Sequence, residues 1–354
     1  MLSFASNSNE QYMKIRSLVF QPILLLCAFM IAFPASANDS TAVLGAGGLE
    51  ITTSDDIVME EEKLFLSPEE IRVRYVFRND TDKDVTTRVA FPLPIVSFGP
   101  ADNFELPDSQ DENFVGFTVT VDGQRLAPAL EQRAVLDNGT DVTAAVRAIG
   151  LPLNAYLPSW EEKIKAVPRE ALRRLVEQGV LEQLSDTVET ADDVSPSWNL
   201  HATFHWEQTF PAQKAVVVEH QYQPVVGSSF FVGDDGELDR LSEEYGTSYC
   251  LDDTTKAGVR RLLQSAAKAN SNGDYKSYVF AYEVSYILKT GANWKGPIGH
   301  FELTIDKIRP DAILSLCIDG VRKTGTTTFK VERDNFTPTR DIGFVVFDQR
   351  ELVE

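Results

Sequence analysis

Apolar and polar residues alternate along much of the chain, and this period of two predicts β-strands with one buried face. The clearest early example covers residues 71–78, where every second residue is large and apolar. A polar turn then leads into the apolar segment 85–91, and Asp122-Gly123 marks a tight hairpin turn. We therefore expect residues 38–135 to form an antiparallel β lobe.

The period of the apolar residues changes from 2 to 3.6 in the next segment, which indicates helices. Asp141 can cap a short helix that runs to Ala148. A second helix is expected from Pro168 to Gly179. We interpret residues 136–195 as a helical insertion within a β protein.

Strand patterns return at Leu200, and residues 196–354 predict a second β lobe with one helix. That helix covers residues 253–269, where apolar residues recur at helical spacing. The predicted fold class is thus mainly β, with antiparallel β-sandwich-like lobes, a helical insertion at about 141–190 and the further helix. Whether the two lobes share one core stays open.

One strand of the second lobe carries an aromatic stripe. From Tyr278 to Leu288 the apolar residues on one face include four aromatic rings. Aromatic residues on one strand face usually belong to a core. If this face met solvent instead, the stripe would offer a platform on which sugar rings could stack.

The first 37 residues have the three parts of a secretory signal. Lys14 and Arg16 supply the positive charge, residues 23–33 form an uninterrupted apolar run, and Ala35-Ser36-Ala37 provides the cleavage site. The run is shorter than the ~18 apolar residues that a membrane span needs, which disfavours an uncleaved anchor. We expect cleavage after Ala37 and a periplasmic or secreted protein.

The start of the signal is ambiguous, because the stretch before Met13 is polar and a signal that begins at Met13 has more usual proportions. Cys27 follows the large residue Leu26 rather than the small residue that a lipoprotein signal places there. We interpret Cys27 as part of the apolar run, so it is removed with the signal.

The charge of the mature chain limits its partners. Removing residues 1–37 takes away one acidic and two basic residues, leaving 52 acidic against 31 basic residues and a formal net charge of −21. Nucleic acid needs a basic footprint and is therefore excluded as a partner. The same charge disfavours docking on anionic lipid.

Two cysteines remain after cleavage, Cys250 and Cys317. In an oxidising compartment two thiols favour one disulfide. The alternative is a pair of buried free thiols.

The histidines raise the question of a metal site. His201 and His205 would share one face of a helix, but the residues around them alternate as in a strand. Residues four apart on a strand lie about 13 Å apart, which is too far for one zinc ion with ligand bonds near ~2 Å. We therefore predict no metal site.

The remaining motifs are weak. Gly45-Ala46-Gly47-Gly48 has no preceding strand and predicts a turn rather than a phosphate loop. The acidic cluster that begins at Asp234 lacks the alternating ligands of a calcium loop, which favours a solvated turn. We predict no cofactor. The residues kept as weak candidates for ligand or partner contacts are His220, Trp206, Trp294 and Asp234.

Several short blocks are distributed along the mature chain. They are Asn38-Asp39-Ser40-Thr41-Ala42, Gly47-Gly48-Leu49, Tyr75-x-Phe77-x-Asn79, Val89-Ala90-Phe91-Pro92-Leu93-Pro94, Trp206-x-x-x-Phe210-Pro211, His220-x-Tyr222-x-Pro224 and Asn293-Trp294-Lys295-Gly296-Pro297-Ile298-Gly299. Together these blocks resemble an exported bacterial family, the domain of unknown function 4424. The resemblance spans nearly the whole mature chain and implies one architecture, with no assigned activity. The hairpin around Tyr75 to Pro94 is also similar to a β-sandwich module of vault and inter-alpha-trypsin proteins, which implies contacts between proteins.

Three functions remain open. Our leading hypothesis is a non-enzymatic binding or scaffold protein of the cell envelope, whose partner is another envelope protein. An exported hydrolase acting on glycans or peptides would instead show a deep pocket lined by His220, Glu207 or Asp234. A small-ligand or carbohydrate-binding module would show an exposed Trp294.

Overall fold

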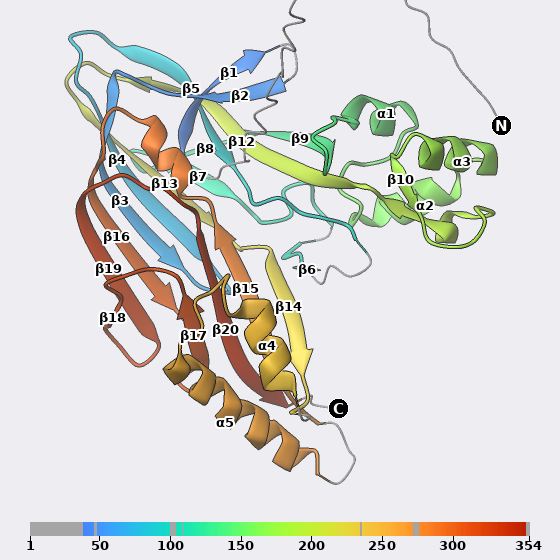
Figure 1. Cartoon of the computed structure of the whole chain (residues 1–354). Coiled ribbons are helices and arrows are strands. Elements are labelled where there is room, and N and C mark those ends of the chain that lie inside the picture. Colours follow the sequence, from blue (N-terminus) through green and yellow to red (C-terminus); the bar gives the residue numbers. More distant parts are fainter. Residues whose placement is uncertain are drawn as a thin grey trace, which may run out of the picture. The chain divides into compact units, whose positions relative to one another are not determined.

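The computed structural model describes residues 38–45, 48–99, 104–108, 110–233, 236–271 and 276–351 (Figure 1). The predicted export signal, Met13 and Cys27 lie outside these residues, as does Asp234. No helix in the described part is long and apolar enough to cross a membrane.

The largest sheet has eight strands in the order β18-β19-β16-β3-β4-β13-β7-β8. All neighbours are antiparallel except β16 and β3, which are parallel. Its strands therefore come from both predicted β lobes. Their bounds are β3 Ile57–Leu66, β4 Ile71–Asn79, β7 Thr118–Val121, β8 Gln124–Leu126, β13 Ala215–Tyr222, β16 Ile298–Asp306, β18 Arg322–Lys323 and β19 Thr328–Phe336.

A five-stranded sheet packs against one face of the eight-stranded sheet. Phe204 on this sheet stacks on Phe117, which immediately precedes β7, with ring centroids 4.3 Å apart, and the buried residues of both sheets form one cluster. The strand order is β2-β1-β5-β12-β9, with β1 Ser40–Gly45, β2 Gly48–Thr52, β5 Val85–Pro92, β9 Ala129–Leu136 and β12 Trp198–Phe210.

A third sheet, in the order β17-β20-β15-β14-β6, carries two helices on one face (Figure 1). A second cluster of buried residues lies between this sheet and the helices. It joins Val279 and Ala281 of the sheet to the apolar side of α5. The bounds are β6 Phe104–Glu105, β14 Val226–Phe231, α4 Glu237–Tyr245, α5 Asp253–Ala269, β15 Ser277–Tyr286, β17 Ile313–Leu316 and β20 Ile342–Glu351. A short 3₁₀ helix, η2 Lys289–Asn293, follows β15.

The expected disulfide is present between Cys250 and Cys317, with the two Cα atoms 5.1 Å apart. It joins the segment between α4 and α5 to the residue after β17.

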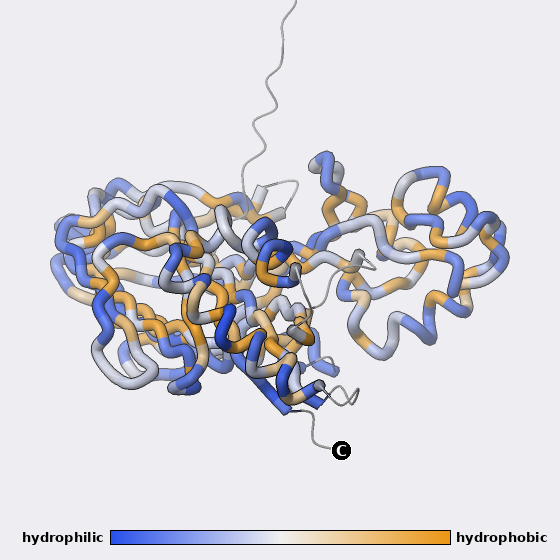
Figure 2. The backbone as a smooth tube through the Cα atoms, turned by 60° about the horizontal axis from the view of Figure 1, so that its bottom comes forward, coloured by the Kyte–Doolittle hydropathy of each residue, from blue (hydrophilic) through white to orange (hydrophobic). Residues whose placement is uncertain are grey.

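The helical insertion contains α1 Thr143–Ala148, α2 Pro158–Lys165 and α3 Arg169–Glu177, followed by the small hairpin β10 Leu181–Gln183 and β11 Val194–Pro196, with η1 Ala191–Asp193 between the two strands. Trp198 at the start of β12 anchors it, since its indole donates a hydrogen bond to the Leu153 carbonyl. In Figure 2 apolar residues recur along the sheets and inside the insertion, and hydrophilic residues gather at outer turns.

The fold class is confirmed as mainly β with antiparallel sheets, and the predicted helix 253–269 matches α5. Helices α2 and α4 were not predicted. α2 buries only Ile164, so it has almost no apolar period to detect. α4 begins at Glu237, within the acidic cluster for which the sequence favours a solvated turn.

The prediction that the aromatic stripe is core was partly wrong. Tyr286 is fully buried, but Tyr278, Phe280 and Tyr282 are only half-buried. At that end of β15 the opposite face, with Val279 and Ala281, packs on the helices instead. The aromatic face there is flanked by Phe230 of β14, whose surface is 57% exposed.

Candidate functional site

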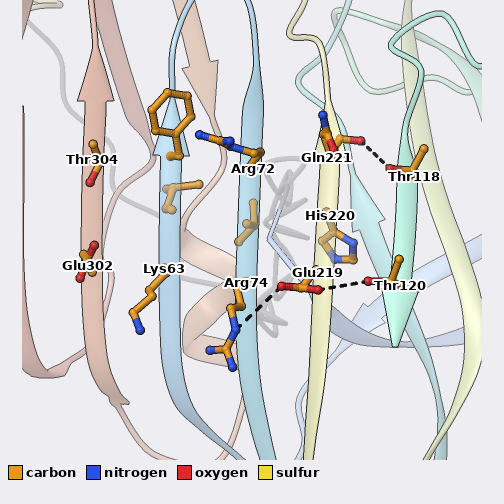
Figure 3. A pocket seen from close by; sticks show the side chains of 13 residues that line it. Lys63, Arg72, Arg74, Thr118, Thr120, Glu219, His220, Gln221, Glu302 and Thr304 are labelled. Atoms are coloured by element: carbon orange, nitrogen blue, oxygen red, sulfur yellow. Dashed lines mark hydrogen bonds and ion pairs between the residues drawn. The ribbon is translucent and has the colours of Figure 1, made fainter. Parts of the chain in front are cut away.

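A hollow of about 420 Å³ lies on the outer face of the eight-stranded sheet, the face turned away from the five-stranded sheet (Figure 3). It spans strands β16, β3, β4, β13 and β7. The polar members of each strand alternation point to this face, because the apolar members fill the core on the other side. The hollow is therefore lined mainly by charged and hydroxyl side chains.

The strand registers align these side chains into two rows across the sheet. In the first row Glu219 lies opposite both Thr120 and Arg74, Arg74 lies opposite Lys63, and Lys63 lies opposite Glu302. Each strand thus contributes one polar side chain, with the two cations between the two carboxylates.

The second row lies two residues further along each strand. Gln221 lies opposite Thr118 and Arg72, Arg72 opposite Phe65, and Phe65 opposite Thr304. The guanidinium of Arg72 lies 4.3 Å from the centre of the Phe65 ring. This row offers amide, guanidinium and hydroxyl groups beside one aromatic ring.

Ion pairs hold the first row in place before any ligand binds. Arg74 is paired with Glu61, and its Nε lies 3.9 Å from a carboxylate oxygen of Glu219. Lys63 also pairs with Glu61 at 2.8 Å. Thr120 donates a hydrogen bond to Glu219 (Figure 3).

The second row is fixed at its edge by Glu70. This carboxylate accepts a hydrogen bond of 2.6 Å from Gln221 and lies 3.3 Å from Arg72. Thr118 donates to the backbone carbonyl of Gln221. Side chains that are held this way lose little freedom when a ligand binds, which favours affinity.

The two carboxylates of the hollow are too far apart to act together in glycoside hydrolysis. Glu219 and Glu302 are separated by three strand spacings, or about 14 Å. Paired carboxylates in glycosidases lie about 5 to 9.5 Å apart. His220 borders the hollow only with its backbone, since its side chain has no exposed surface.

The inner face of the same strands carries a buried polar network. Glu62 of β3, Tyr75 of β4 and His220 of β13 point inward, where they meet Asn38 and Asp39 at the start of the described chain. All five residues are at most 2% exposed. The hollow and the network are thus the two faces of one set of strands.

Hydrogen bonds tie Asn38 and Asp39 to strands β3, β4 and β13, and Tyr75 extends the network to β15. His220 Nε2 lies 2.9 Å from an Asp39 carboxylate oxygen. The Asn38 side-chain amide donates to both Glu62 oxygens, at 3.2 and 3.3 Å. Tyr75 donates to the Asn38 side-chain oxygen and lies 3.0 Å from the Tyr286 hydroxyl.

The backbone carbonyls of Asn38 and Asp39 also accept hydrogen bonds. Thr290 donates to the Asn38 carbonyl at 2.9 Å, and the Trp294 indole donates to the Asp39 carbonyl at 2.7 Å. Residues far apart in the sequence therefore converge on the two residues that follow the predicted cleavage site.

Burial is the main cause of the raised pKa values in the network. It raises the pKa of Glu62 to about 8, opposed by the Asn38 amide. It also raises the pKa of Asp39, against the attraction of His220. The same burial raises the pKa values of the Tyr75 and Tyr286 hydroxyls. Two carboxyl groups are thus held where a negative charge is disfavoured.

The structure buries three of the four candidate interaction residues. His220, Trp206 and Trp294 are 2%, 7% and 3% exposed, so Trp294 is not an open stacking surface. His220 and Trp294 belong to the network, and the Trp206 and His220 rings lie 5.5 Å apart. The fourth candidate, Asp234, lies outside the described residues.

Three other residues named in the sequence analysis, His201, His205 and Glu207, lie on strand β12. His201 and His205 lie on strand β12, as the alternation predicted, and burial lowers the pKa of both. Glu207 lies on the same strand and is exposed. Within the described residues no group of three or more potential metal ligands occurs.

Sequence reasoning missed Asn38, Asp39 and Glu62. The signal that could have found them is the combination of polar residues directly after the cleavage site and an acid among the apolar residues of a strand. The β-bulge between Met59 and Glu61 hides the second clue, because it shifts Glu62 to the inner face.

The family described as domain of unknown function (DUF4424) matches residues 37–345. No curated protein matches the chain. A solved structure of a Legionella pneumophila protein, described as a candidate nutrient-binding protein, is similar over 88% of this chain and 70% of that chain, at 16% identity and a TM-score of 0.45. A TM-score below 0.5 does not establish a shared fold, so that description applies to the Legionella protein alone.

Proposed function

Because the chain belongs to the family described as domain of unknown function (DUF4424), which names no activity, we propose a function from the geometry of the hollow. The protein is a non-catalytic binding protein of the bacterial cell envelope. Its ligand is polar and rich in hydroxyl groups, such as a segment of a glycan. The export signal predicted over residues 1–37 supports the location.

The observation that carries this proposal is the pair of fixed polar rows. Carboxylates accept hydrogen bonds, guanidinium groups donate them, and hydroxyls do both. A sugar needs donors and acceptors at close, regular intervals, and the rows provide them one strand spacing apart. The Phe65 ring in the second row adds an apolar surface beside them.

The same geometry disfavours the hydrolase alternative at this site. A hydrolase needs an acid and a base or nucleophile close to one bond. The hollow instead places two cations between its two carboxylates. These groups suit binding without bond cleavage.

The test is a binding measurement with soluble oligosaccharides, first on a glycan array and then by calorimetry. For a ligand found in this way, Arg74→Ala is expected to weaken binding at least tenfold. The matched control is Arg78→Ala, because Arg78 lies on the same strand and the same face, is also ion-paired and does not line the hollow. The absence of any glycan ligand, or equal losses in both variants, would refute the proposal.

A second candidate function is docking of another envelope protein on the aromatic surface formed by Phe230, Tyr278, Phe280 and Tyr282. Its support is the 57% exposure of Phe230 together with three neighbouring half-buried rings. Large exposed aromatic residues are typical of protein interfaces. Crosslinking in the periplasm tests it, since Phe230→Ser should remove a crosslinked partner while leaving glycan binding unchanged.

A further inference from the structure

The burial of Asn38 and Asp39 is unusual for residues that directly follow a predicted signal peptide. Chain ends normally lie at the surface and are poorly ordered. Here both residues are 0% exposed and are bonded through side chains and backbone. The fold therefore provides a specific site for this short segment.

The charges of the network are unbalanced. Two buried carboxyl groups, on Asp39 and Glu62, face His220 and the hydroxyls of Tyr75 and Tyr286. His220 bonds to Asp39, so Glu62 has only the neutral Asn38 amide and tyrosine hydroxyls around it. No lysine or arginine of the described residues pairs with either carboxylate. A buried carboxyl group without a cationic partner normally keeps its proton, because burial disfavours its charged form.

We propose that cleavage after Ala37 completes this site, in which the new α-ammonium group of Asn38 pairs with the buried carboxylate of Glu62. The site is thus a receptor for the mature N-terminus within its own fold. This inference goes beyond the binding function proposed above and rests on the predicted cleavage position.

The chemistry of the cleavage supplies the missing cation. A peptidase hydrolyses the amide between Ala37 and Asn38, and one water molecule is consumed. The carboxylate stays on Ala37, and the nitrogen of Asn38 becomes an amine that takes up a proton. Before cleavage the same nitrogen is a neutral amide.

The reach of this group follows from the contacts of Asn38. Its side-chain amide nitrogen lies 3.2 Å from a Glu62 oxygen. Four covalent bonds separate that nitrogen from the α-nitrogen, so the two lie within about 5 Å of each other. The new ammonium therefore lies within about 8 Å of that Glu62 oxygen, a range over which opposite charges in a buried site attract.

The acidity of Glu62 agrees with this arrangement. Without a cationic partner, burial raises its pKa to about 8, so it is mostly protonated at neutral pH. An ammonium group nearby favours the ionised form and lowers that pKa. Cleavage then converts a neutral acid into one half of a buried ion pair.

The test compares two purified chains, one beginning at Asn38 and one that keeps Ala37, each released from a cleavable fusion. A ¹⁵N NMR titration measures the pKa of the Asn38 α-ammonium, which is ordinarily about 7.7–8.0. In the chain that begins at Asn38 we expect a pKa at least one unit higher. In its Glu62→Gln variant that rise should disappear.

Thermal unfolding gives a second readout, which is independent of the NMR titration. Glu62→Gln should lower the melting temperature of the chain that begins at Asn38 and leave that of the Ala37-bearing chain unchanged or raised. The matched control is Glu69→Gln, because Glu69 is exposed on the turn after the same strand. It should have no effect on either chain.

Three results would overturn the proposal. One is an ordinary pKa for the Asn38 α-ammonium in the folded chain. Another is an equal effect of Glu62→Gln on the two chains. The third is a mass for the exported protein that places its N-terminus at another residue, and this outcome leaves the glycan-binding proposal untouched.

Discussion

The contact between His220 and Asp39 should be one of the strongest single determinants of stability, and its removal gives a quantitative prediction. Both side chains have no exposed surface, and one hydrogen bond of 2.9 Å joins them. Removing one partner of a buried pair leaves the other uncompensated, which costs about 3–5 kcal/mol. We expect the lower end, about 3 kcal/mol, for His220→Phe, because Asp39 can take up a proton.

The choice of phenylalanine separates the pair from simple packing. The His220 ring lies 4.9 Å from the Phe91 ring and 5.1 Å from the Phe117 ring, so another aromatic ring should fit this pocket. A large loss of stability then reports the polar contact rather than a cavity.

Urea unfolding followed by tryptophan fluorescence provides the assay, since Trp206 and Trp294 lie beside the pair. Asp39→Asn and the double variant complete a double-mutant cycle. We expect the double variant to be less destabilised than the sum of the two single variants by at least ~1 kcal/mol. Additive losses, or a loss below ~1 kcal/mol for His220→Phe, would refute the reasoning.

Three further predictions concern stability. Removing the disulfide with Cys250→Ser and Cys317→Ser should lower the free energy of unfolding by about 4 kcal/mol by loop entropy, measured by urea unfolding. In the chain that keeps Ala37, the raised folded-state pKa of Glu62 means that stability is lost as pH rises from about 4.5 to about 8, by up to ~1.4 kcal/mol per pH unit. Glu62→Gln should flatten that slope in pH-dependent unfolding curves. Asn270→Ala should cost about 2–3 kcal/mol, because the amide bonds to the backbone of Val232, Lys276 and Ser277, and thermal unfolding would show it.

The elements that sequence patterns predicted best are those with a full apolar period. Strand β12 alternates over its whole length, and helix α5 has a complete apolar stripe with an aspartate cap at Asp252. Helix α2 buries a single residue and gave no such pattern. Local periodicity therefore predicts an element when that element buries a whole face.

The rows of the hollow could not be predicted, because they depend on which strands are neighbours. Lys63 meets Glu302 only because β3 pairs in parallel with β16 from the other end of the chain. No local pattern encodes that pairing. The outward direction of Glu219 and the inward direction of His220, by contrast, follow from alternation along one strand.

The aromatic stripe shows another limit of sequence patterns. Alternation correctly placed Tyr278 and Tyr286 on one face of a strand, but that face is covered at one end and half-open at the other. The residues that bury Tyr286, such as Tyr75 of β4, lie on another sheet. The sequence of β15 alone does not show how much of its face that sheet covers.

The parallel pairing of β3 with β16 also constrains the order of events during folding. The eight-stranded sheet cannot be completed beyond β3 until β16, near the C-terminal end, is available to pair with that early strand. Contacts between such distant segments form slowly, because a long loop must be ordered first. Until residues 298–306 have been made, the edge of β3 that β16 covers therefore stays unpaired, and an unpaired strand edge is a site at which other chains can pair.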